Sequence, residues 1–248
     1  MNKNFWKKCT LLLLTCAMML ATVFSMGACG GKGGEDASNE PVDFTKLTYV
    51  AIGDSITWGK DGETGQQMVK PYPDLVAEEL QLQNVKNCGK SGATLLYSDS
   101  NEYAMKLVQD APSKADIVSV MMGVNDFAGA KKLGQAGDTG YDSIYGSLYN
   151  LVQQIQTKYP NAFIFFMTPL KQYRNPDVNS AGYRLSDVAT AVKTVCASYQ
   201  VPVLDLYELV DYSAQTDPNS DGLHPTQMFM VTYTSPYIVD FIQENYGA

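Results

Sequence analysis

The sequence has few of the residues that metal sites and nucleic-acid surfaces need. Its 248 residues include one histidine, His224, and five cysteines that form no C-x-x-C pair. A structural zinc ion takes four Cys or His ligands, so the composition argues against a zinc site. Lys and Arg number 18 against 26 Asp and Glu, a net charge of −8. Phosphate binding needs clustered basic side chains, so the charge argues against a nucleic-acid partner.

The N-terminus carries the one long apolar run, over residues 11–24, which follows three lysines and precedes the small residues before Cys29. This pattern is typical of a secretory signal, and the run is shorter than the roughly 20 residues of a membrane-spanning helix. Met26-Gly27-Ala28-Cys29 resembles the lipobox of bacterial lipoproteins, in which the cysteine is acylated and becomes the first residue. We expect a signal peptide over 1–28 and a lipid on Cys29 that holds the protein at the outer face of the membrane. Ordinary secretion or an uncleaved anchor are the alternatives.

Residues 29–43 are rich in Gly and charge and predict a flexible tether, which leaves 44–248 as one folded domain. Removal of the signal takes away three lysines and no acidic residue, which moves the net charge from −8 to −11. Cys88 and Cys196 remain in the domain. They form either one disulfide or two separate buried thiols.

Apolar runs alternate with stretches of helical periodicity along this domain. The runs cover 47–52, 85–88, 117–122, 162–167 and 201–204, and the predicted helices cover 72–80, 144–155, 185–199 and 227–244. Continuous apolar strands indicate burial on both faces, as in a parallel sheet, and the alternation predicts an α/β fold. Residues 127–141 are rich in Gly and Ala and predict a surface loop.

Polar blocks follow the predicted strands, where ligands bind in parallel α/β sheets. They are Gly53-Asp54-Ser55, then the Gly89–Thr94 segment with Gly92, then Gly123-Val124-Asn125-Asp126, and finally Asp221-Gly222-Leu223-His224. Together they supply a hydroxyl, backbone N–H groups, an amide and an Asp/His pair, the parts of an acyl-transfer site.

His224 is the single histidine, so any histidine base must be this residue. Asp221, three residues earlier, can accept the Nδ1 proton and orient the ring, and Asp217 is a weaker rival. A carboxylate beside the ring is expected to raise the pKa of His224. We expect Asp54 and Asp126 to order their loops.

The four blocks, in this order, resemble those of the SGNH or GDSL-like hydrolase superfamily over about residues 47–230. The resemblance implies a flavodoxin-like three-layer α/β/α sandwich with a parallel five-stranded sheet. It implies Ser55 as nucleophile, His224 as base and Asp221 as its orienting partner. The oxyanion hole would consist of the backbone N–H groups of Ser55 and Gly92 and the side chain of Asn125. Such a site needs no metal or organic cofactor.

Two other nucleophile or phosphate motifs are excluded. The G-x-S-x-G elbow of α/β-hydrolases is absent because Thr57 occupies the second glycine position. Gly89-Lys90-Ser91 resembles the end of a phosphate loop, but Asn84 stands where that loop needs its first glycine.

The substrate is less well defined by the sequence. Trp58, Tyr72, Tyr97 and Tyr173 lie near strand ends, where rings can stack on sugars, although tyrosine is abundant throughout with 16 copies. We expect an extracellular monomeric esterase that deacetylates a carbohydrate. Hydrolysis of short-chain esters or lysophospholipids is the alternative, and an inert carbohydrate-binding surface lipoprotein is the alternative of another class.

Overall fold

The computed structural model describes residues 42–99 and 102–247, and five parallel strands form its sheet. The strands are β1 (Thr48–Gly53), β2 (Asn84–Gly89), β3 (Ile117–Met121), β4 (Phe163–Met167) and β5 (Val203–Leu204), in the order β2-β1-β3-β4-β5. The predicted parallel five-stranded sheet is therefore confirmed. The predicted signal peptide, Cys29 and nearly all of the predicted tether lie outside the described residues.

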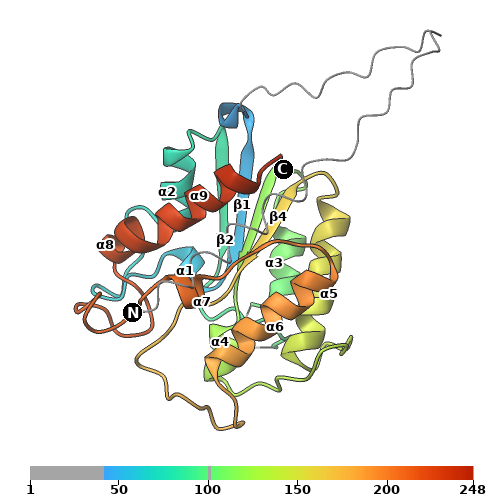
Figure 1. The fold of residues 1–248 in the computed structure, drawn as a ribbon, viewed down its shortest axis with the longest axis vertical. Coiled ribbons are helices and arrows are strands. Elements are labelled where there is room, and N and C mark those ends of the chain that lie inside the picture. The colour runs from blue at the N-terminus through green and yellow to red at the C-terminus, as the bar shows by residue number, and fades with distance from the viewer. Residues whose placement is uncertain (1–41, 100–101, 248) are drawn as a thin grey trace, which may run out of the picture. The chain divides into compact units, whose positions relative to one another are not determined.

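Helices cover both faces of the sheet (Figure 1). One face carries α2 (Tyr72–Glu79) and the C-terminal helices α8 (Gln227–Phe229), η2 (Met230–Thr234) and α9 (Ser235–Asn245). The other face carries α3 (Ala104–Asp110), α5 (Ile144–Lys158) and α6 (Leu185–Ser198). The three-layer α/β/α sandwich is confirmed.

The helical segments that the periodicity missed are short. They are η1 (Phe44–Lys46), α1 (Ser55–Trp58), α4 (Val124–Ala128), α7 (Leu206–Leu209) and α3. A helix of one or two turns shows too little of the 3.6-residue period to be recognised. The predicted helix over 227–244 consists of three segments, because a π-helical stretch at η2 interrupts it. The predicted loop over 127–141 begins within α4, which ends at Ala128.

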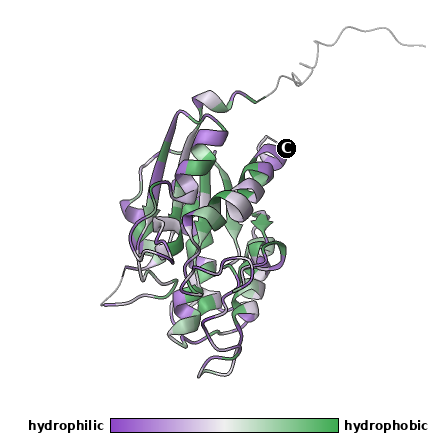
Figure 2. Cartoon of the chain, turned by 90° about the vertical axis from the view of Figure 1, so that its left-hand side faces the viewer, coloured by the Kyte–Doolittle hydropathy of each residue, from purple (hydrophilic) through white to green (hydrophobic). Residues whose placement is uncertain are grey.

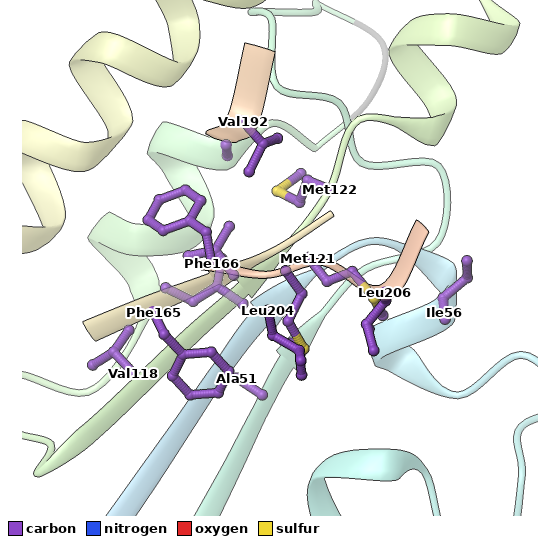
Figure 3. Close-up of a cluster of buried hydrophobic side chains, with 14 of the residues drawn as sticks. Ala51, Ile56, Val118, Met121, Met122, Phe165, Phe166, Val192, Leu204 and Leu206 are labelled. Atoms are coloured by element: carbon purple, nitrogen blue, oxygen red, sulfur yellow. The ribbon is translucent and has the colours of Figure 1, made fainter. Parts of the chain in front are cut away.

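The apolar runs form the core. All five residues of β3 are buried, and so are five of the six in β1. Their side chains meet those of β4 and α6 in one cluster, which Figure 3 shows around Ala51, Val118 and Phe165. Figure 2 shows hydrophobic residues concentrated on these inner strands. β2 is one of the two edge strands and the most accessible of the five, and this accounts for its weaker apolar pattern.

The two cysteines of the domain are free thiols, which decides between the two alternatives left by the sequence. Cys196 is buried in the core, where burial raises the pKa of its thiol to about 12, and Cys88 is half-buried in β2. Within residues 42–99 and 102–247, no helix has the length and apolar character needed to cross a membrane.

Candidate active site

Ser55 follows the carboxyl end of the inner strand β1 and is the first residue of α1. Asp54 caps that helix, with its Oδ1 accepting from the N–H of Ile56 at 2.9 Å. The chain folds back so tightly that a Cβ on Gly53 would lie 1.9 Å from the Thr57 hydroxyl oxygen. A glycine is therefore required before the Asp-Ser pair, and the fold places the Ser55 side chain beyond the end of the sheet.

A hydrogen-bonded chain links Ser55, His224 and Asp221. Ser55 Oγ lies 3.0 Å from His224 Nε2, and His224 Nδ1 lies 2.9 Å from Asp221 Oδ2. Residues 55 and 224 are 169 positions apart in the sequence, so only the fold brings them together. Both are 5% exposed, so little water competes for this contact. The hydroxyl, imidazole and carboxylate thus have the arrangement of a nucleophile, its base and an orienting acid.

The Asp221 carboxylate also fixes the backbone of its own turn. Its Oδ1 accepts from the N–H groups of Leu223 at 2.9 Å and His224 at 2.7 Å. Asp217, the rival in the sequence, instead binds Thr226 through the backbone N–H and the hydroxyl, both at 2.8 Å. The geometry therefore makes Asp221 the carboxylate that holds the imidazole.

The loop after α1 packs against the backbone of His224 and Pro225, a contact that no pattern in the sequence indicates. Gly62 donates its N–H to Pro225 O at 3.1 Å. A Cβ on Gly62 would lie 1.9 Å from His224 O, so only glycine allows this approach. Asp61, in the same loop, accepts from Gln227 N at 2.9 Å. An Asp-Gly pair such as Asp61-Gly62 is common in turns, so the sequence does not single it out. The role of Gly62 comes from its contact with His224, which only the fold creates.

A second support comes from the long connection between β4 and α6. Tyr173 N and Arg174 N both approach Gly222 O, at 3.3 and 3.2 Å. Gln172 Nε2 donates to Leu223 O at 3.1 Å, and the Tyr173 hydroxyl donates to Asp217 O at 3.0 Å. These bonds hold the Asp221–His224 turn against the rest of the fold.

Gly92 and Asn125 are the other predicted oxyanion-hole residues. Gly92 lies in the loop after β2, and Asn125 lies in the first turn of α4, after β3, at the same end of the sheet. Gly92 has a φ of +78°, and the space where its Cβ would stand is open. The Asn125 amide donates one N–H to Ala93 O at 2.8 Å, which leaves its second N–H for a ligand. Ser55 N belongs to the first turn of α1, where N–H groups lack helical partners.

Asp126 ties α4 to the loop that carries Gly92. Its carboxylate accepts from Leu95 N at 2.8 Å and Leu96 N at 3.1 Å, and the side chain is fully buried. Burial raises the pKa of Asp126 to about 6 and that of Asp54 to about 7. Both carboxylates order their loops, as expected, and neither contacts Ser55 or His224 in the described hydrogen bonds.

The pKa of His224 is lowered, which corrects the expectation of a raised value. Burial of the ring disfavours the imidazolium more than the Asp221 carboxylate favours it. The positive charges of Lys60 and Arg174 lower the pKa further. The ring is therefore neutral at pH 7 and able to accept a proton.

The aromatic residues suggested for sugar stacking differ in exposure. Tyr72 is fully buried, with its hydroxyl 3.1 Å from that of Thr57, so it cannot meet a substrate. Trp58 is half-buried. Tyr97 is 58% exposed and Tyr173 is 37% exposed.

Comparison with known proteins agrees with this geometry. The family model of the GDSL-like lipase/acylhydrolase family matches residues 51–228. A search among curated proteins found no match.

Several solved structures share the fold. A Lactobacillus plantarum protein is 29% identical, with a TM-score of 0.69 over 81% of this chain and 99% of its own. A possible lipase from Chitinophaga pinensis is 24% identical, with a TM-score of 0.64 over 80% of this chain and 98% of its own. The native aryl esterase of M. smegmatis is 17% identical, with a TM-score of 0.60 over 80% of this chain and 99% of its own. The last two likenesses concern the fold alone.

The family match spans every block from Ser55 to His224, and the fold and the hydrogen-bonded chain agree with it. The chain therefore belongs to the GDSL-like lipase/acylhydrolase family, as an esterase or acylhydrolase of the SGNH type.

Proposed function

We propose that the protein hydrolyses a carboxylic ester through an acyl intermediate on Ser55. The observation that carries the proposal is the hydrogen-bonded chain from Ser55 Oγ through the His224 ring to Asp221. Ser55 Oγ attacks the ester carbonyl carbon while His224 Nε2 takes its proton. The C–O bond then breaks, and the alcohol leaves with that proton. Water repeats the sequence at the acyl carbon and releases the acid.

The negative charge on the carbonyl oxygen is stabilised by the N–H groups of Ser55 and Gly92 and the Asn125 amide. One such donor is worth roughly 3 kcal/mol in the transition state. The free second N–H of Asn125 and the open space at Gly92 support this assignment. The bond from Asn125 to Ala93 O keeps the amide in place before the substrate arrives, so little reorganisation is needed.

For the substrate we propose an acetylated carbohydrate. A cavity of about 330 Å³ adjoins the elements that carry the site, with Phe127 of α4 and Gln172 among its lining residues. Nine of its twelve lining residues have charged, amide or hydroxyl side chains. Such a lining offers donors and acceptors to sugar hydroxyls and little apolar surface to a long acyl chain.

A second candidate is the ester of an anionic alcohol, such as a lysophospholipid. Lys60 and Arg174 both act on His224 through their charges, and Arg174 Nη1 lies 3.6 Å from Asp221 Oδ2. In a protein of net charge −8, two cations beside the base favour a negative group on the substrate.

We also propose that the enzyme works outside the cell, held to the membrane by a lipid on Cys29. The signal-like N-terminus supports this location, and polymeric or membrane esters would be within reach there.

An activity panel tests these proposals on the full chain in detergent. It compares p-nitrophenyl acetate, longer acyl esters, acetylated xylan and a lysophospholipid. We expect acetyl esters to be hydrolysed best and acetylated xylan to release acetate. A fluorophosphonate probe should label Ser55 and fail on Ser55→Ala. Labelling of another serine would refute the mechanism. Hydrolysis of the lysophospholipid alone would refute the proposal that the substrate is an acetylated carbohydrate.

A further inference from the structure

Two adjoining cavities form a groove on the face of the sheet covered by α3 and α5. Their volumes are about 760 and 480 Å³, and both are lined by Met105, Gln109 and Tyr141. We call the joined cavities the α3–α5 groove. None of its lining residues contributes to the Ser55–His224–Asp221 chain.

One end of the groove is aromatic. Tyr97, Tyr103 and Tyr141 line the larger cavity, and Tyr97 and Tyr141 are each 58% exposed. Tyr97 and Tyr103 meet edge to face, with ring centroids 5.0 Å apart. Rings held in place but open to water present an apolar face together with a hydroxyl. The C–H face of a pyranose ring is a matching surface for them.

The other end of the groove is lined mostly by uncharged polar side chains. Four of the residues lining the smaller cavity are amides, and Thr157 adds a hydroxyl; the amides are Gln109, Asn150, Gln153 and Gln154. An amide carries both donors and an acceptor, which is what a sugar hydroxyl requires of its partner. The Asn150 amide nitrogen already donates to Thr139 O and Gly146 O, at 2.8 and 2.7 Å, so this residue offers a ligand its carbonyl oxygen. Gln154 Nε2 donates one N–H to Met105 O at 3.3 Å.

The charges that line the groove are already compensated. Lys158 Nζ donates to three backbone carbonyls, at 2.5 Å to Val108 O, 2.6 Å to Ala111 O and 3.2 Å to Gln109 O. Asp142 pairs with Lys132 at 2.7 Å. These are the two charged residues that line the described groove, so its ligand should be neutral.

The groove is connected to the catalytic end of the sheet. Leu95 lines the larger cavity and follows Gly92 in the same loop. Its N–H donates to Asp126, which immediately follows Asn125. A chain-like ligand in the groove would therefore extend toward the loops of the oxyanion hole.

We propose that the α3–α5 groove is a second carbohydrate-binding site, which takes a neutral polysaccharide strand and holds it beside the catalytic site. The link to catalysis rests on the proposed deacetylation of a carbohydrate, whereas binding in the groove does not require it. Stacking on the tyrosines and hydrogen bonds to the amides provide the affinity.

The test uses the full chain in detergent and the double variant Tyr97→Ala/Tyr141→Ala. The matched control is Tyr233→Ala/Tyr237→Ala, because those rings are 46% and 39% exposed in η2 and α9 on the other face. Binding is measured by calorimetry with unacetylated xylan and with cellohexaose. Hydrolysis is measured with p-nitrophenyl acetate and with acetylated xylan.

We expect wild type and control to bind at least one neutral glycan, and the groove variant to bind it about tenfold or more weakly, since two aromatic contacts are lost. The kcat/KM of the groove variant should fall by about the same factor for acetylated xylan. For p-nitrophenyl acetate it should stay within about twofold of the wild-type value. Equal binding by wild type and groove variant would overturn the proposal, as would binding of a peptidoglycan peptide in place of both glycans. A wild type that binds xylan but releases no acetate would contradict the deacetylation and leave the groove supported.

Discussion

Gly62→Ala should damage catalysis from a position outside the hydrogen-bonded chain. The new Cβ would lie 1.9 Å from His224 O, 3.0 Å from His224 C and 3.1 Å from Asp221 N. Even a tight contact of about 3.0 Å requires the two loops to separate by about 1.1 Å. His224 is bonded to Ser55 at 3.0 Å, so a shift of this size breaks or misaligns that contact.

The expected loss follows from that displacement. A misplacement of about 1 Å can cost roughly 10²-fold in rate, so we expect kcat to fall by about that factor with KM little changed. Overpacking of a close contact costs about 1–3 kcal/mol of stability as well. The assay is steady-state hydrolysis of p-nitrophenyl acetate, together with the rate of fluorophosphonate labelling and a thermal melt.

Gly65→Ala is the matched control in the same loop. Gly65 has a φ of +70° and no heavy atom within 4 Å of its added Cβ. The left-handed conformation costs a side chain about 1–2 kcal/mol, so this variant should melt at a lower temperature and keep its kcat. A folded Gly62→Ala variant with the kcat of wild type would refute the reasoning, because the close approach would then have no bearing on His224.

Further predictions concern the site and the N-terminus. Asn125→Ala should lower kcat about 10²-fold or more and leave KM nearly unchanged, since the amide acts on the transition state; an unchanged kcat removes Asn125 from the oxyanion hole. The pH profile of kcat/KM should fall on acidification with a pKa below the ordinary 6.5 of histidine, because His224 must be neutral and its burial lowers the pKa. An acidic fall of kcat/KM with a pKa above 6.5 would contradict this expectation. Asp221→Asn should lower kcat by about 10³–10⁴-fold and move the limb further down, as the imidazolium loses its partner. Asp217→Asn should lower stability by about 1 kcal/mol and leave the limb in place, because Asp217 binds Thr226; the reverse result exchanges the two roles. Cys29→Ser should release the protein from the membrane fraction, and mass spectrometry showing an unmodified Cys29 in the mature wild type would disprove the anchor.

The sequence by itself determined the architecture. Continuous apolar runs at 117–122 and 162–167 required strands buried on both faces, and strands of that kind occur in parallel sheets covered by helices. The polar blocks at the strand ends were also readable from the sequence, because ligands meet parallel strands at their carboxyl ends. The single histidine left no other choice of imidazole base.

Tertiary structure alone decided how the groups of the site act on each other. Asp217 and Asp221 both precede His224 closely, and only the fold shows which carboxylate meets the ring. The pKa of His224 depends on how deeply the fold buries its ring, which no local pattern records. The need for glycine at position 62 comes from its contact with His224, which is far from it in the chain. The α3–α5 groove is likewise lined by segments that are distant in the sequence. Local sequence fixes which elements form, whereas burial and close approach arise only when those elements pack.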